Sequence, residues 1–169
     1  MACNLTQSFL KSCRENVGGT LEFYFSNRPT TFSTTIGASG ISAYTGTCSW
    51  YKYVPRKQTS TFTTNIKASE ENGTVFYEST VQLILTKMEQ NKQNEIYLLA
   101  QADLLCIVKD QNGKYWLLGE VNGVSLVDSS GTVGTAYGDR NGYELNFIAS
   151  EPSKTNEILY SAFSAQIAA

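Results

Sequence analysis

The chain has 169 residues, of which 41% are hydrophobic and 17% charged, with a formal net charge of −2 at pH 7. These values predict one globular domain rather than a disordered chain, and the small net charge argues against a protein that binds nucleic acid by electrostatic attraction. Residues 1–20 contain no apolar run typical of a secretory signal, and the most apolar segment, residues 96–108, is too short to span a membrane and contains Gln101 and Asp103. We therefore expect a soluble protein that is made in a cytoplasm.

The first third of the chain predicts strands separated by irregular segments. Residues 1–20 show no periodic pattern, and residues 20–27 are typical of a β-strand. Residues 28–46 are rich in Gly, Ser and Thr and predict a loop, with a short strand at its end. Residues 47–54 are rich in aromatic side chains and predict another strand.

A long β-hairpin is the clearest pattern in the sequence. Residues 59–87 form two runs of alternating polar and apolar residues joined by Asn72-Gly73, a dipeptide that suits a tight hairpin turn. At about 3.3 Å per residue each run could extend roughly 35–45 Å, which is long for a strand. One face is apolar and is expected to be core, with Phe62, Ile66, Val81 and Leu83. The other face carries Thr61, Thr63, Asn65, Lys67, Glu78, Thr80 and Gln82.

The second half predicts one helix followed by a meander of strands. Residues 91–103 show helical spacing of apolar side chains, with Asn91 as the N-cap. Residues 104–110, 114–121 and 143–150 are expected to be strands. The Asn-Gly pairs at 112–113, 122–123 and 141–142 are expected to be hairpin turns. The fold class is therefore mainly β (α+β): an antiparallel β-sandwich or barrel with a long hairpin and one flanking α-helix.

The chain divides into two expected parts, a β domain over residues 1–151 and a C-terminal arm or short helix over residues 152–169. The second part is rich in large apolar side chains that need to be covered, so we expect it to dock on another subunit. The residues expected in this contact are Ile158, Leu159, Tyr160 and Phe163.

No pattern in the sequence points to catalysis. The chain has no histidine, which excludes a Ser-His-Asp triad, and the glycine-rich residues 131–139 do not match a phosphate-binding loop. The four cysteines at 3, 13, 48 and 106 include no Cys-x-x-Cys pair, so we expect reduced thiols and no metal site. We therefore predict no enzyme, no catalytic residue and no cofactor.

Aromatic side chains leave two interpretations open. Trp50, Tyr51, Tyr53 and Trp116 could form a platform on which sugars stack, or they could belong to the core of the sheets. The first interpretation would suit a carbohydrate-binding fibre or adhesin domain. A third possibility is a barrel that closes around a small ligand within one subunit.

The long hairpin suggests a ring. A hairpin that extends past its own domain exposes unpaired backbone edges, and pairing with identical neighbours removes them. Six subunits giving four strands each, or twelve giving two, would form a 24-stranded barrel of roughly 48 Å backbone diameter. The polar face of the hairpin would line its channel, wide enough for duplex DNA. The alternative is an ordinary amphipathic sheet with a solvated outer face.

Three stretches of the sequence resemble a known family: "YKYVPRKQTSTFTTNIKASEENGTVFYESTVQLIL", "NEIYLLAQAD" and "CIVKDQNGKYWLLGEVNGVSLVDSSGTVGTAYGDRNGYELNF". Together with the opening "MACNLTQSF", they are similar to tail-tube and tail-ring (collar) structural proteins of tailed bacteriophages, particularly crAss-like phages. The resemblance covers about residues 50–149 and does not extend past Glu151. It implies a virion protein of the tail, assembled in the host bacterial cytoplasm, whose rings contact adjacent tail, collar or portal proteins and let double-stranded DNA pass.

Overall fold

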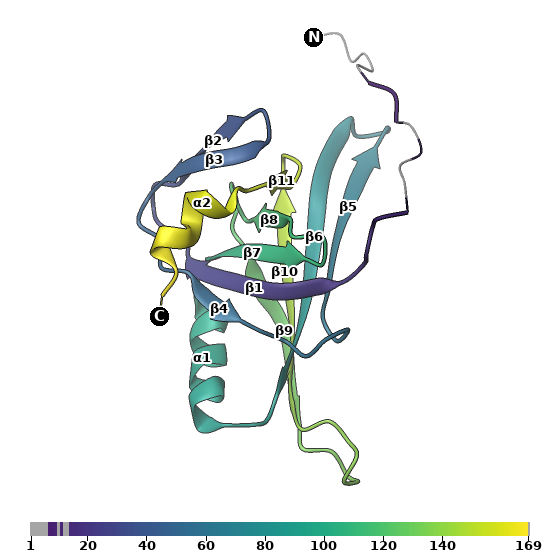
Figure 1. Ribbon diagram of the computed structural model, residues 1–169, viewed down its shortest axis with the longest axis vertical. Helices are drawn as coiled ribbons and strands as arrows, with labels where there is room; N and C mark the ends of the chain where they lie inside the picture. The colour runs from purple at the N-terminus through teal and green to yellow at the C-terminus, as the bar shows by residue number, and fades with distance from the viewer. Residues whose placement is uncertain (1–6, 10, 12–13, 169) are drawn as a thin grey trace.

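The structure is a computed structural model that describes residues 7–9, 11 and 14–168. Two antiparallel sheets pack face to face, and a two-stranded hairpin and the C-terminal residues cover the outer side of one of them (Figure 1). The molecule is therefore a layered β-sandwich rather than a closed barrel. The prediction of a mainly β, antiparallel fold is confirmed.

The two sheets differ in strand order. The five-stranded sheet has the order β11-β8-β7-β1-β4, and the four-stranded sheet has the order β5-β6-β10-β9. The strands of the first are β1 (Thr20–Asn27), β4 (Tyr51–Tyr53), β7 (Leu104–Asp110), β8 (Tyr115–Leu118) and β11 (Asn156–Glu157). Those of the second are β5 (Thr61–Ser69), β6 (Thr74–Thr86), β9 (Ser125–Thr132) and β10 (Gly142–Glu151). A separate hairpin joins β2 (Ser33–Gly37) to β3 (Gly40–Thr45).

The main core lies between the two sheets. Phe23 and Phe25 of β1 meet Leu83 of β6 and Phe147 of β10, and the Phe25 and Phe147 rings are 4.6 Å apart. Helix α1 (Gln90–Gln101) adds the buried side chains Ile96 and Leu99 to this core. The helix begins after Glu89 rather than at Asn91, without a side-chain cap.

Strand β7 is buried on both faces. Its first five residues, Leu104 to Val108, are all buried, because a second core covers the far side of the five-stranded sheet. This second core contains Trp50, Ile41 of β3 and Phe163 of the short helix α2 (Tyr160–Phe163). A continuous apolar run rather than an alternating one is typical of a strand covered on both sides.

The C-terminal segment corrects one expectation. Ile158 and Phe163 are 1% and 0% exposed within the chain's own second core, while β11 pairs with β8, and a 3-10 turn, η1 (Ser164–Gln166), follows α2. These two side chains cannot dock on another subunit as predicted, because the β2–β3 hairpin and the five-stranded sheet already cover them. Leu159 is half-buried and Tyr160 remains exposed, stacked on Tyr115.

Three local expectations are also wrong. Residues 28–46 were expected to be mostly loop, but they contain the whole β2–β3 hairpin. Asn122-Gly123 is not a hairpin turn, because it connects β8 and β9, which belong to different sheets. Asn141-Gly142 is not a hairpin turn either: Gly142 is the buried first residue of β10, and it lies so close to β6 that an added Cβ would be 2.0 Å from the Leu85 carbonyl oxygen. Gly142 is therefore required for close strand approach rather than for a positive φ.

Candidate functional site

The seven polar residues predicted to line a channel lie together on one face of the four-stranded sheet. Thr61 pairs with Gln82, Thr63 with Thr80, and Asn65 with Glu78 across β5 and β6. Residues two apart on a strand share a face, which places Lys67 beside them. This polar face points away from the core, because the neighbouring positions Val81 and Leu83 belong to the inter-sheet core.

The face continues across β10 and β9 with residues that the sequence did not single out. Gln82 lies opposite Asn146 of β10, and Asn146 lies opposite Asp128 of β9. Alternation within residues 143–150 could have identified Glu144 and Asn146, but the order of the strands in the sheet was needed to place them beside Gln82. We call this surface the polar face; it carries mostly hydroxyl, amide and carboxylate groups, and it also includes Phe76 opposite Lys67 and Ile148 opposite Thr80.

Ion pairs neutralise much of the charge on the polar face. Lys67 Nζ lies 3.6 Å from a Glu78 carboxylate oxygen, and an Arg140 guanidinium nitrogen lies 2.9 Å from a Glu144 carboxylate oxygen. Gln82 also donates a hydrogen bond of 2.6 Å to Glu144. The hydrogen bond from Arg140, followed by that from Gln82, lowers the pKa of the Glu144 carboxyl below its ordinary value. The polar face is thus well hydrated and nearly neutral.

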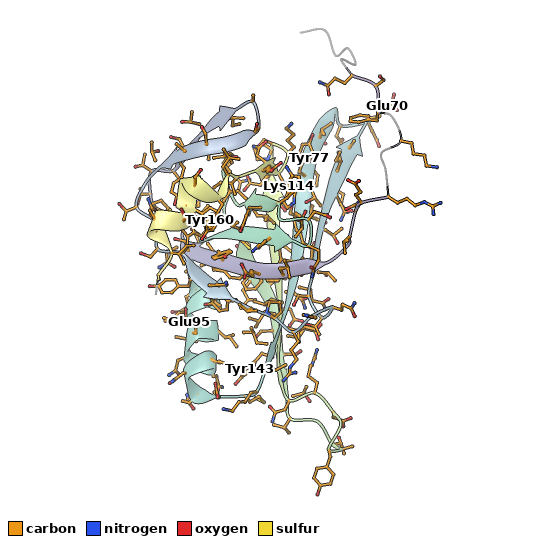
Figure 2. The ribbon with its side chains drawn as sticks, in the orientation of Figure 1. Glu70, Tyr77, Glu95, Lys114, Tyr143 and Tyr160 are labelled. Carbon is orange, nitrogen blue, oxygen red and sulfur yellow. The ribbon has the colours of Figure 1, made fainter. Side chains whose placement is uncertain are left out.

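The outer half of the β5–β6 hairpin projects beyond the five-stranded sheet (Figure 1). Glu70 marks its tip in Figure 2. Here the side that was expected to be core is uncovered, since Ile66 is 64% exposed and Val75 of β6 is exposed as well. The expectation that Ile66 belongs to the core is therefore wrong, because no layer lies over it among the residues that the structure describes.

Both edge strands of the four-stranded sheet are open. β5 pairs only with β6, and β9 pairs only with β10, among the residues that the structure describes. Neither edge strand contains a proline, and β9 contains no lysine, whereas β5 contains Lys67 and the β9–β10 pairing has a register shift at Asn146 and Phe147. Proline, lysine and bulges are common means of preventing edge-to-edge pairing, so these two edges are only partly protected.

The aromatic residues do not form a sugar platform. Trp50 is completely buried, and its indole N–H donates a 2.7 Å hydrogen bond to the Tyr44 hydroxyl. Trp116 is half-buried, and its indole N–H donates to Asp110. The core interpretation therefore holds for Trp50, whereas Trp116 belongs to neither of the two cores and Tyr51 is exposed.

The described residues also bear on metal and ligand sites. They contain no group of three His, Cys, Asp or Glu side chains placed to hold a metal ion. Cys48 and Cys106 are buried free thiols, and burial raises the pKa of both; Cys3 and Cys13 lie outside the described residues. The space between the two sheets is filled by side chains rather than forming the interior of a ligand-binding barrel.

Comparison with known proteins adds no relative. No protein-family model matches the chain. A search of curated proteins likewise finds no match. No helix among the residues that the structure describes is long and apolar enough to cross a membrane.

Proposed function

We propose that this protein is a virion structural protein that forms a ring of a bacteriophage tail, as a tube or collar layer. In this proposal the polar face of the four-stranded sheet lines a channel through which double-stranded DNA passes. The observation that carries the proposal is the combination of a polar outer face with two open edges on the same sheet. The resemblance of the sequence to tail-tube and tail-ring proteins supports the same assignment.

The strand directions favour continuation of this sheet from one copy to the next. Each strand in the order β5-β6-β10-β9 is antiparallel to its neighbour. β5 and β9 therefore run in opposite directions, and β9 of one copy placed beside β5 of the next gives another antiparallel pair. The edges are also similar in length, with nine residues in β5 and eight in β9. Head-to-tail contacts of this kind close into rings when the rotation between copies fits.

The number of strands favours six subunits over twelve. Four strands from each of six copies give 24 strands, and a spacing of about 4.8 Å with a tilt of about 40° gives a backbone diameter of roughly 48 Å. The five-stranded sheet, α1 and the C-terminal residues would then lie outside the barrel. The four-stranded sheet would be supported on its outer side by the hydrophobic core that it already shares with the five-stranded sheet.

The chemistry of the polar face suits passage of DNA rather than binding. Hydroxyl and amide groups hold water, and the two ion pairs of Lys67 and Arg140 leave few free cations for phosphates. A wall rich in unpaired Lys or Arg would instead hold phosphates with strong, salt-dependent affinity. The wall would therefore keep the channel open and hydrated while DNA moves through it.

Electron microscopy of the purified full-length chain, together with native mass spectrometry, tests the proposal. We expect closed rings with the mass of six copies and a central opening. The position of the same chain is also determined in the intact tail, so that rings that assemble only on a neighbouring virion protein are detected. A tail structure in which this chain is present without β5–β9 pairing between copies would refute the proposal.

A further inference from the structure

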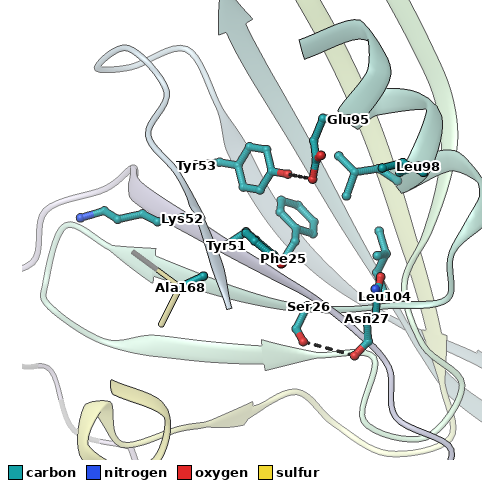
Figure 3. Close-up of a pocket in the computed structure, with 11 residues that line it drawn as sticks. Phe25, Ser26, Asn27, Tyr51, Lys52, Tyr53, Glu95, Leu98, Leu104 and Ala168 are labelled. Atoms are coloured by element: carbon teal, nitrogen blue, oxygen red, sulfur yellow. Dashed lines mark hydrogen bonds between the residues drawn. The ribbon is translucent and has the colours of Figure 1, made fainter. Parts of the chain in front are cut away.

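A cleft lies beside the edge of the five-stranded sheet, between β4 and helix α1 (Figure 3). It has a volume of about 660 Å³, and a smaller cleft of about 280 Å³ continues from it along the helix. Tyr51 and Tyr53 line it from β4, and Leu98 and Glu95 line it from α1. Leu98 is 57% exposed and Tyr51 is 50% exposed, so this groove leaves large apolar side chains in water.

The strand edge in the groove also has free backbone groups. Trp50, just before β4, is already paired outward: its N–H donates to the Gln166 carbonyl, and its carbonyl accepts from the Ala168 N–H. Backbone groups alternate sides along an antiparallel strand, so Lys52 presents its N–H and C=O on the same side as Trp50. Among the described residues, no partner pairs with these two groups of Lys52. An edge next to an apolar groove is the arrangement to which extended peptides add as a further strand.

The chain itself carries a segment of matching chemistry at its N-terminus. Residues 4–13, "NLTQSFLKSC", contain Leu5, Phe9 and Leu10, and Phe9 is 95% exposed. The groove offers Glu95, which accepts a 3.1 Å hydrogen bond from the Tyr53 hydroxyl and has no ion-pair partner among the described residues, whereas Lys52 is paired with Glu22 at 2.7 Å. The segment carries Lys11 two residues after Phe9. The segment thus contains an aromatic and a basic residue that match the apolar lining and the carboxylate of the groove.

The described residues 7–9 of this segment lie away from the groove of their own chain. Residues 7–9 lie toward the end of the molecule that carries the tip of the β5–β6 hairpin, whereas α1 lies at the opposite end (Figure 1). We propose that the groove between β4 and α1 binds the N-terminal segment of a second copy of this chain, with Phe9 as its anchor. The segment adds to the edge at Lys52, and its aromatic ring contacts Leu98 and Tyr51. This contact is separate from the β5–β9 pairing of the proposed ring.

The first experiment measures peptide binding to the full-length chain. A fluorescent peptide of residues 1–13 is titrated into the Phe9→Ser chain, whose groove is intact but whose own anchor is removed. We expect saturable binding that weakens about tenfold or more when Leu98→Glu is added. Tyr97→Glu is the matched control, because Tyr97 is 63% exposed on the same helix but does not line the groove. Absence of binding to a folded chain, or equal loss in both variants, would overturn the proposal.

The second experiment separates binding to a second copy from binding within one chain. The photoreactive residue benzoylphenylalanine replaces Phe9, and equal amounts of ¹⁵N-labelled and unlabelled chains are mixed before illumination. We expect cross-linked peptides of mixed isotopic composition that contain Tyr51 or Leu98. Cross-links within one isotope only would show that the segment folds back on its own chain, and cross-links elsewhere would show that the groove is not the site. Rings that still form with Leu98→Glu would leave the proposed channel intact while this contact is lost.

Discussion

The docking of α1 on the sandwich can be tested by replacing Leu99 with alanine. Leu99 is 5% exposed and belongs to the inter-sheet core, so the change removes three carbon atoms from a buried site. At about 0.8 kcal/mol per buried carbon the transfer cost alone is about 2.4 kcal/mol. Leu-to-Ala changes in cores cost about 2–5 kcal/mol, and the value rises with the cavity that remains. Because Leu99 also lines the open groove beside α1, water and neighbouring side chains can fill the space. We therefore expect the lower part of that range, about 2–3 kcal/mol.

Urea unfolding, followed by circular dichroism, measures this difference for chains in the same oligomeric state. Leu98→Ala is the matched control: Leu98 is the preceding residue on the same helix and is exposed, so we expect a change of about 0.5 kcal/mol or less. The m-values of the two variants should agree, because both unfold from the same compact state. Equal free energies of unfolding for the two variants would mean that α1 does not pack on the sandwich through Leu99.

Three further predictions concern the sheets and the polar face. Gly142→Ala should destabilise the fold by about 2 kcal/mol or more in urea unfolding, because its Cβ would collide with β6, whereas Gly138→Ala, which meets nothing within 4 Å, should change stability little. Burial raises the pKa of the Glu151 carboxyl above its ordinary value, so the contribution of this group to stability should fall as the pH rises from the ordinary pKa through the raised one. The difference in unfolding free energy between wild type and Glu151→Gln should show this slope when it is measured from pH 4 to 7. A difference that does not change with pH would refute the prediction. Thr80→Arg should leave the chain folded but make rings bind duplex DNA and slow genome ejection. The logarithm of the DNA-binding constant should fall with the logarithm of salt concentration with a slope of about −0.9 for each phosphate that an added arginine neutralises. Leu83→Arg should prevent folding, and the reverse order of tolerance would mean that the two faces of the sheet are wrongly assigned.

Alternation was sufficient to locate the strands that face a core on one side. The predicted ends of 20–27 and 104–110 agree with β1 and β7, although β7 is a continuous apolar run that is buried on both faces. The Asn72-Gly73 turn separates β5 from β6 as expected, and in these two strands side-chain polarity alternates with the period of the backbone, so the sequence contains the information directly. The same property identified the polar face of the hairpin before its partners were known.

The second core could not be predicted in the same way. Its cover comes from β2 and β3, whose sequence is rich in Gly, Ser and Thr and contributes the single fully buried side chain Ile41. Apolar residues in the C-terminal segment showed that something must cover Ile158 and Phe163. Their pattern is the same whether the cover is another subunit or the chain itself. Only the placement of β2–β3 over the five-stranded sheet decides between these two possibilities.

Closure of the proposed ring would satisfy the sheet edges but not every exposed apolar side chain. Pairing of β9 with the next β5 would supply partners for backbone groups, whereas Ile66 and Val75 lie on the core side of the sheet and are exposed there. Lateral contacts within one ring extend the sheet sideways and add no layer over that side. In the proposed tail, a neighbouring layer would supply the contact that covers these two side chains. The length of the hairpin would then have a physical reason: its inner half supports the core of one subunit, and its outer half would present an apolar surface to the adjacent layer.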